Sequence, residues 1–446
     1  MRNLAFRDMR LPRLGANNLK GILGRYSIEG VTPLSVWDAA NQIARSGGDA
    51  IPLQTLFANT RNGEATYVDA SGAIVTQTAL KSITNHYIDG VAHALFQPSR
   101  TNSITNSVFG GAVAGVLSGT GELPTGLSVS STMATSAVTV ALGTENGMPY
   151  LDLRFNGTPT GTVFINFTEA RDVVAAPGDT WTGSLFLKRA AGSNTNLTSL
   201  QLFVQESASN GSGNVRTSTA NFATTFGDFT RHSIARTFTE ATTTRANMFL
   251  RLEAFGAIDI TLRFYGPQLE KGAFATTYIP TSGSAVTRLA DAASCALTTL
   301  PVDTTGGTIF IEGRAYYDAG VNGFSRIFQI DDGTNDNSIQ LFLRQGDNDL
   351  QFFVSAGGVT QISERMAYTY GEVFSAAVRF AGNDGILSLN GSNSTADTSV
   401  TMPNGLTTFR WAQSAGGQSD ATVAISKFRS FDHEFTTAEI NAVTGA

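Results

Sequence analysis

Short runs of alternating apolar and polar residues, separated by turn formers, recur along most of this chain. Residues 107–280 and 306–431 consist almost entirely of such runs. A period of two places successive side chains on opposite faces of a β-strand, so each run predicts a strand with one buried face. Because many short strands joined by turns are typical of sandwiches, the pattern predicts an all-β protein with two β-sandwiches in series.

Length and composition agree with this organisation. A chain of 446 residues is too long for one hydrophobic core, and its 41% hydrophobic residues are enough to form several. We divide it into an N-terminal arm with a short helix (1–60), a β-hairpin connector (61–106), a first sandwich (107–283) and a second sandwich with a C-terminal helix (284–446).

Three local elements stand out beside the strands. A helix is predicted from Thr32-Pro33 to Gly47-Gly48, with one apolar face made by Val36, Ala40, Ile43 and Ala44. A β-hairpin is predicted over 65–76, around a turn at 69–72. At the other end, Thr436 and Glu439 have capping-box spacing, which predicts a final helix.

Charge is unevenly distributed along the chain. The net charge is −6, so the body lacks the basic surface that nucleic acid requires, and we expect no nucleic-acid partner. The first 30 residues nevertheless hold six basic and two acidic groups. We interpret this basic segment as an arm that docks on an acidic protein surface; the alternative is a solvated terminus. The proposed docking residues are Arg2, Arg7, Arg10 and Arg13.

Targeting and redox signals are few. Cys295 is the only cysteine, which excludes an intrachain disulfide and a CxxC pair. The N-terminus has no continuous apolar stretch, so we expect no signal peptide and synthesis in a cytoplasm. No run approaches 18 apolar residues, so we expect no membrane insertion.

Motifs of common enzymes are missing. The sequence contains no HExxH, no GxSxG and no GxxxxGK[ST]. A β-sandwich glycanase needs two carboxylates beside the scissile bond, and Glu-x-Asp-x-x-Glu on a strand would supply them; no glutamate here has an aspartate two positions later. We therefore expect no enzymatic activity and no cofactor.

Two groups of residues are candidates for binding. Asp331, Asp332 and Asp336 concentrate oxygen ligands in one turn, as a calcium ion would need, although such residues also form ordinary solvated turns. A sugar site would combine aromatic rings with amides and charged groups. In the second sandwich the candidates for this role, each with core or surface packing as the alternative, are Tyr316, Tyr317, Arg326, Gln340, Arg344 and Trp411.

The segment 265–291 joins the two predicted sandwiches. It has turn formers at Pro280 to Gly283 and only four charged residues among apolar and small ones. We interpret it as a hinge that does not contact a ligand.

Three motifs in this order resemble those of tailed-phage or gene-transfer-agent-like virion fibre and spike proteins. They are ATYVDASG at 65–72, QPSRTN at 97–102 and QLEKGAFATTYIPTSGSAVTRLAD at 268–291. The chain departs from the pattern before the first motif, where FANTRNGEATYVD replaces the usual FxRAS lead-in, and the first 60 residues match no known pattern.

The regions around these motifs also resemble known domains. GDTWTGSLFLKR is similar to an early strand of jelly-roll carbohydrate-binding modules. GTIFIEGRAYY, SRIFQIDDG and ISKFRSFDHEFTTAEI resemble a concanavalin A-like or laminin-G-like lectin domain. The resemblance implies a jelly roll at 107–283 and a concanavalin A-like sandwich at 284–446.

The resemblance also implies a function. We expect a virion surface fibre or spike on the tail or head, a homotrimer that docks on tail, baseplate or capsid proteins and binds host cell-surface polysaccharide. Two alternatives are a purely structural decoration protein and a polysaccharide depolymerase.

Overall fold

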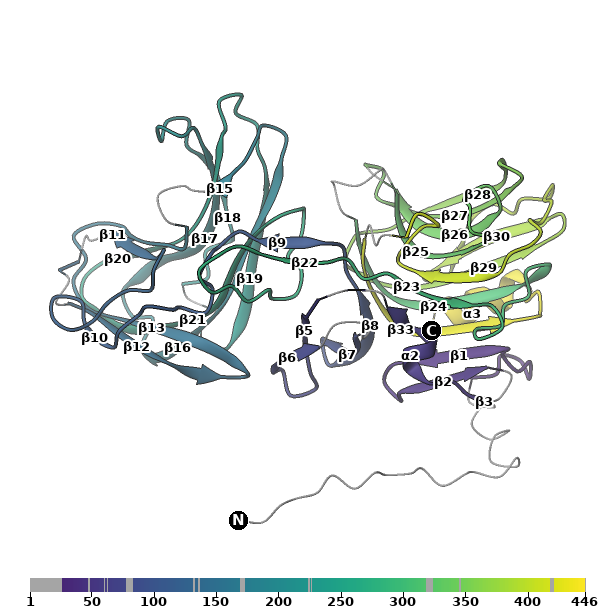
Figure 1. Ribbon diagram of the computed structural model, residues 1–446, viewed down its shortest axis with the longest axis horizontal. Coiled ribbons are helices and arrows are strands. Elements are labelled where there is room, and N and C mark those ends of the chain that lie inside the picture. Colours follow the sequence, from purple (N-terminus) through teal and green to yellow (C-terminus); the bar gives the residue numbers. More distant parts are fainter. Residues whose placement is uncertain are drawn as a thin grey trace, which may run out of the picture.

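Two β-sandwiches lie side by side in the computed structural model, linked by the strands β9 and β22 (Figure 1). No helix of the described chain is long and apolar enough to cross a membrane. The structure describes residues 26–46, 49–59, 61, 63–77, 83–130, 133–134, 137–168, 173–223, 225, 227–317, 324–344, 346–417 and 421–445.

The first sandwich is formed by two sheets of six strands each, counted over the described residues. In one sheet the order is β10-β12-β13-β21-β16-β19: β10 Gly115–Val116, β12 Val138–Glu145, β13 Met148–Gly157, β21 Ile258–Lys271, β16 Thr180–Gly192 and β19 Thr230–Thr237. In the other the order is β11-β14-β20-β17-β18, with β15 also on β20: β11 Ser128–Ser130, β14 Val163–Asn166, β20 Arg245–Ala254, β17 Leu197–Ser207, β18 Val215–Ser218 and β15 Val173–Val174.

Alternation along the strands builds the core of this sandwich. On β21, Ile260, Leu262 and Phe264 are fully buried, whereas the intervening Asp259 and Arg263 face outward and form ion pairs. Each apolar side chain buried in this way contributes about 1.5–3 kcal/mol. The period-two prediction for 107–280 is thus confirmed in the strands that the structure describes.

The second sandwich also has two sheets. The larger has the order β3-β2-β1-β33-β24-β29-β30-β31, with β8 on β33 and β7 on β8: β3 Asp49–Ala50, β2 Ile43–Ser46, β1 Ser35–Asp38, β33 Ala421–Phe431, β24 Gly306–Tyr317, β29 Val373–Ala381, β30 Asp384–Leu389, β31 Ser392–Asn393, β8 Val91–Phe96 and β7 Ile83–Ile88. The other is β28-β27-β26-β25-β32-β23-β4: β28 Val359–Ala367, β27 Asp349–Ala356, β26 Ser338–Arg344, β25 Phe324–Asp331, β32 Thr408–Trp411, β23 Ala293–Ala296 and β4 Ala58–Asn59.

The helix predicted from Thr32-Pro33 to Gly47-Gly48 is wrong. Within its described part, β1 and β2 form an antiparallel hairpin in which Trp37 lies opposite Ala44. β1 also pairs with β33, almost 400 residues along the chain, which places Trp37 opposite Phe428. Edge pairing to an existing sheet satisfies the backbone of this segment, so tertiary contacts override its helical pattern. One turn of helix, α2 Leu53–Leu56, does follow.

The N-terminal segment completes the core of the second sandwich. The Trp37, Phe57 and Phe96 rings are fully buried, and they pack against one another and against Trp411 at centroid distances of 5.0–6.1 Å. Aromatic pairs at this distance stabilise a core beyond their buried area. The sheets of the second sandwich thus include strands from the predicted segments 1–60 and 61–106 as well as from 284–446. The division into domains stays a prediction.

Two local predictions are confirmed. The hairpin consists of β5 Ala65–Val68 and β6 Ile74–Gln77, joined through a turn whose amides donate to Asp69. The C-terminal helix α3 Thr437–Thr444 begins with the predicted capping box, because Thr436 and Glu439 exchange side-chain and backbone hydrogen bonds.

The link between the sandwiches is a short ribbon of β9 Arg100–Asn102 and β22 Val286–Arg288. Asn102 is fully buried and binds backbone groups from three separate points of the chain. Its Oδ1 accepts hydrogen bonds from the Ile104 and Leu269 amides, and its Nδ2 donates to the carbonyl of Ile279. The asparagine of the QPSRTN motif therefore fixes the backbone at residues 104, 269 and 279 by hydrogen bonds.

Three of the four charged residues of the segment 265–291, Glu270, Arg288 and Asp291, are buried, whereas Lys271 is exposed. Asp291 is fully buried; its Oδ1 accepts from Asn59 Nδ2 at 2.7 Å and from Arg61, and its Oδ2 accepts from the Gln97 amide at 2.9 Å. Arg288 lies 3.9 Å from the same carboxylate. A buried ionic network therefore connects the connector to the second sandwich.

Glu270 is the second buried carboxylate of the junction. It accepts hydrogen bonds from the backbone amide and hydroxyl of Thr276 at 2.8 and 2.7 Å, and it lies 3.8 Å from Arg100. Gly272 has a φ of 146°, and a Cβ there would lie 2.6 Å from Arg100 Nη2. Glycine is required at this position because the guanidinium passes directly against the backbone.

Candidate functional site

The outer face of the seven-stranded sheet carries a concave site. On β26, the core side chains Ile339, Leu341 and Leu343 are fully buried. The alternate residues Gln340 and Arg344, with Phe342 between them on the same side, therefore face outward. Together with their neighbours on β25, β27 and β28 they line a cavity of about 440 Å³, which we call the outer-sheet groove.

Strand register sets the groove residues in rows. Arg326 on β25 pairs with Phe342 on β26, which pairs with Gln351 on β27, which pairs with Arg365 on β28. Directly opposite residues of an antiparallel pair have neighbouring side chains. One row across four strands thus holds two arginines with an aromatic ring and an amide between them.

Aromatic side chains form one wall of the groove. The Phe324 and Phe342 rings meet edge to face at 5.1 Å, and Phe353 lies 6.1 Å from Phe342. The Arg326 guanidinium lies 5.6 and 5.9 Å from the first two rings, within the range of a cation–π interaction. Phe324 is 40% exposed, so this wall presents an apolar surface to solvent.

Amides form the floor, and arginines form the rim. Gln340 and Gln351 are buried, and each is held by a serine hydroxyl: Gln340 donates to Ser338 at 2.7 Å and Gln351 to Ser363 at 2.9 Å. Arg344 pairs with Asp347 on the adjoining turn at 2.9 Å.

Arg365 is exposed and has no ion pair with a described residue. Its guanidinium therefore offers hydrogen-bond donors to a ligand at the rim.

The arrangement of these groups suits the binding of a small ligand. Apolar walls with a few fixed polar groups are the general design of sites for small ligands. The donors of the arginines and amides suit hydroxyl and carboxylate oxygens, and the rings suit the apolar face of a pyranose. Among the described residues that line the groove, Asp336 is the only carboxylate, whereas glycoside hydrolysis uses a pair.

Three of the six predicted sugar-binding residues come together in the groove: Arg326, Gln340 and Arg344. The other three lie elsewhere. Trp411 is fully buried among Phe409 and Phe428, and its Nε1 donates to the carbonyl of Leu56, so it presents no surface to a ligand.

Tyr317 is buried too and stacks on Tyr370 at 5.6 Å. Tyr316 packs against Phe274 and lines a second cavity, at the junction.

The groove also contains residues that the sequence analysis missed: Phe324, Phe342, Phe353, Gln351 and Arg365. The outward positions of β26 and β27 were available from the period-two pattern. The pattern could not show which strands would be neighbours, because their pairing depends on register. The predicted docking residues Arg2, Arg7, Arg10 and Arg13 lie outside the described residues.

The three predicted calcium ligands have separate local partners. Asp331 is fully buried and accepts from Arg410 Nε at 2.7 Å and from the Gly333 amide at 2.8 Å. Hydrogen bonds, chiefly from the Thr334 hydroxyl, lower the pKa of Asp332. Asp336 lies at the groove. In the described part of the chain, no three His, Cys, Asp or Glu side chains are grouped to hold a metal ion, and calcium binding stays a prediction.

Several solved structures resemble parts of this chain. A Ruminococcus gnavus sialidase CBM40 bound to sialyllactose is 15% identical, with a TM-score of 0.28, and covers 32% of this chain and 83% of its own. A leech intramolecular trans-sialidase is 14% identical (TM-score 0.27; 32% and 24% covered). The Caenorhabditis elegans galectin LEC-6 is 15% identical (TM-score 0.20; 28% and 82% covered). At these TM-scores the likenesses support no conclusion about function. No family model and no curated protein matches the chain.

Proposed function

We propose that this protein binds a glycan, without catalysis, in the outer-sheet groove. The observation that carries the proposal is the row of Arg326, Phe342, Gln351 and Arg365 across four strands, beside the exposed ring of Phe324. Such a surface offers a pyranose an apolar platform and several hydrogen-bond donors. The described lining holds one carboxylate, that of Asp336, whereas glycoside hydrolysis uses a pair, and this supports binding over hydrolysis.

We further propose that the protein is a virion surface fibre or spike. This part rests on the motifs at 65–72, 97–102 and 268–291, which resemble those of tailed-phage virion proteins. The basic N-terminal arm would dock on the particle, and several copies, three in the expected trimer, would combine weak sugar sites into firm attachment.

Binding is tested by titrating surface polysaccharide fragments into the protein and into two variants. Arg365→Ala removes an exposed cation of the rim, and Phe324→Ala removes the exposed part of the wall. Each variant is expected to weaken binding about tenfold, because each removes a direct ligand contact. The matched controls are Arg216→Ala and Phe255→Ala, exposed residues of the first sandwich that should leave binding unchanged.

Two further assays distinguish the alternative functions. Silence of the intact oligomer across a glycan array would favour a structural decoration protein. New reducing ends or unsaturated sugars after incubation with polysaccharide would identify a depolymerase instead. Electron microscopy of particles labelled with an antibody to this chain tests the virion assignment and shows head or tail directly; unlabelled particles would refute it.

A further inference from the structure

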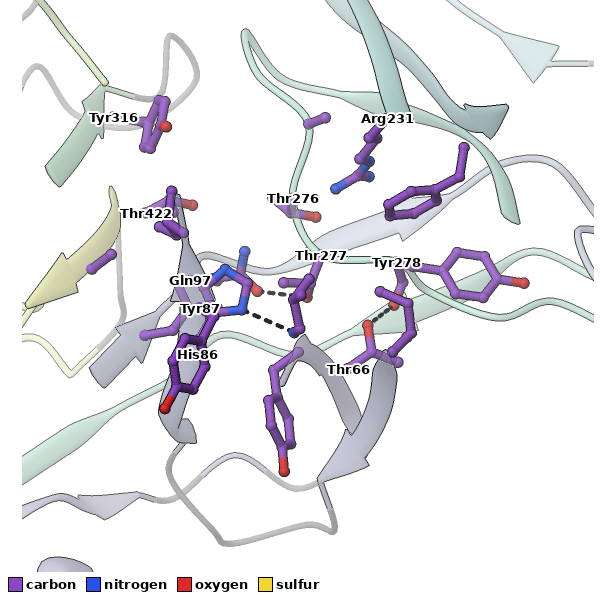
Figure 2. A pocket seen from close by; sticks show the side chains of 18 residues that line it. Thr66, His86, Tyr87, Gln97, Arg231, Thr276, Thr277, Tyr278, Tyr316 and Thr422 are labelled. Carbon is purple, nitrogen blue, oxygen red and sulfur yellow. Dashed lines mark hydrogen bonds between the residues drawn. The ribbon is translucent and has the colours of Figure 1, made fainter. Parts of the chain in front are cut away.

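A second cavity of about 460 Å³ lies at the junction of the two sandwiches (Figure 2). Its walls come from four parts of the chain: the hairpins around His86, the first sandwich around Arg231, the junction segment at residues 275–278, and the second sandwich around Tyr316. The volume is within the usual range for a small-molecule site, about 300–1,000 Å³. We call it the junction pocket.

Arg231 is the most unusual group of this pocket. It lies on β19, the edge strand of its sheet, and its guanidinium points into the space between Tyr316, Thr422 and Gln97 (Figure 2). Its face packs over the Phe186 ring at 5.2 Å. Among the described residues, only Ser184 binds this guanidinium: Nη2 donates to its Oγ at 3.0 Å, while the buried Nε has no partner there.

No described residue forms an ion pair with Arg231. Glu270, the carboxylate whose charge acts on Arg231, is already bound to Thr276 and lies beside Arg100. Burial lowers the pKa of Arg231, but a guanidinium stays charged at neutral pH. A recessed cation with unused donors is costly unless an anion compensates it.

Other donors face the same space. His86 is buried, and its Nδ1 accepts from the Val68 amide at 3.1 Å, so the neutral ring carries its proton on Nε2, which has no acceptor among the described residues. Burial, with the neighbouring His93, lowers the pKa of His86 to about 3, which keeps the ring neutral. The Gln97 amide oxygen accepts from Thr277 at 2.8 Å, and its nitrogen is likewise unused by the described chain.

The other lining residues include the apolar side chains of Leu95, Phe186 and Ala275 and the Tyr316 ring, together with the hydroxyls of Thr66, Thr276 and Thr277, which already donate within the protein. Thr422 adds a buried hydroxyl that has no partner among the described residues. Donors without matching acceptors select a ligand that is rich in acceptor oxygens. A planar guanidinium matches a carboxylate in particular, because two parallel hydrogen bonds can form. We propose that the junction pocket binds a carboxylate-bearing sugar unit of monosaccharide size, with its carboxylate on Arg231. This site is separate from the outer-sheet groove.

The test uses the full chain and three probes measured by calorimetric titration: glucuronate, glucose and acetate. Glucuronate is expected to bind at least about tenfold more tightly than either of the others, since only it offers both the carboxylate and the pyranose. Arg231→Gln should weaken glucuronate binding about tenfold or more. Arg216→Ala, an exposed arginine of the same sandwich, should not.

A second readout does not depend on the folding of a variant. In the unmodified protein, the ring signals of His86 should move on titration with glucuronate, while those of the exposed His433 should stay in place. Equal affinity for glucuronate and glucose, or for glucuronate and acetate, would overturn the proposal. So would loss of glucuronate binding in Arg365→Ala with full binding in Arg231→Gln, because the ligand would then be in the groove.

Discussion

Replacing Asp291 by asparagine is the sharpest test of how the junction is held. The change is nearly isosteric, but it removes the carboxylate charge that both Arg61 and Arg288 contact. All three side chains are at most 2% exposed, so water cannot compensate the loss. The new amide nitrogen would also face donors, because both carboxylate oxygens now accept hydrogen bonds, from Asn59 and from the backbone of Gln97 among others.

The magnitude follows from the uncompensated charge. Asp291 and Glu270 now oppose the buried cations Arg61, Arg100 and Arg288. Losing one partner of a buried ion pair costs about 3–5 kcal/mol, and we expect Asp291→Asn to lower the free energy of unfolding of the second sandwich by that amount.

Guanidinium unfolding followed by tryptophan fluorescence measures this free energy. Trp37 and Trp411 report the second sandwich, whereas Trp181 reports the first. The exposed Asp432→Asn is the matched control and should change stability by less than about 0.5 kcal/mol.

A double-mutant cycle adds a second check. Adding Arg61→Met to Asp291→Asn removes one of the cations that the first change leaves uncompensated. The loss in free energy of unfolding for the double variant should therefore be at least about 1 kcal/mol smaller than the sum of the two single losses. A loss below about 1 kcal/mol for Asp291→Asn, with no coupling to Arg61, would refute the view that this network holds the junction.

Three further results are expected. Thr436→Ala should lower the free energy of unfolding by about 1 kcal/mol, measured by thermal or chemical unfolding, because it removes the N-cap of α3. The neighbouring Thr437→Ala should lower it much less. Equal losses for the two variants would contradict the capping role. Hydrogen bonds, first from Lys188, lower the pKa of Glu145 from 4.5 to about 2, so its contribution is complete above pH 4.5 and is lost as the pH falls toward 2. Wild type should therefore lose about 2 kcal/mol more than Glu145→Gln over that range, and parallel pH profiles would count against this. Burial raises the pKa of Cys295 to about 12, so a disulfide reagent at pH 8 should label it only after unfolding, and rapid labelling of native protein would show that the site opens.

The periodic strands were predictable because their signal is local. On the first half of β21, alternation of buried and outward-facing residues follows directly from the sequence. The capping box at Thr436 was predictable for the same reason: its partners are three residues apart. The three groove residues predicted correctly, Arg326, Gln340 and Arg344, lie at outward strand positions.

The N-terminal hairpin shows where local reasoning failed. Residues 35–46 have a helix-like apolar pattern, but Trp37 completes a core that also contains Trp411, and Ser35 is hydrogen-bonded to Ser430. A sequence segment as long as one or two helical turns contains no information about a partner 395 residues away. Trp411 was wrongly predicted to bind a ligand for the same reason. The sequence pattern around an aromatic residue on a strand is the same whether its side chain points into the core or toward solvent.

The sequence by itself determined the strands, their turns and their two faces, because a period of two is a property of consecutive residues. Only the tertiary structure decided which strands are neighbours. That choice set Arg326, Phe342, Gln351 and Arg365 in one row, and it gathered Glu270, Arg288 and Asp291 into a buried network. The physical reason is that register and burial depend on contacts between segments far apart in the chain, whose free energy no single segment contains.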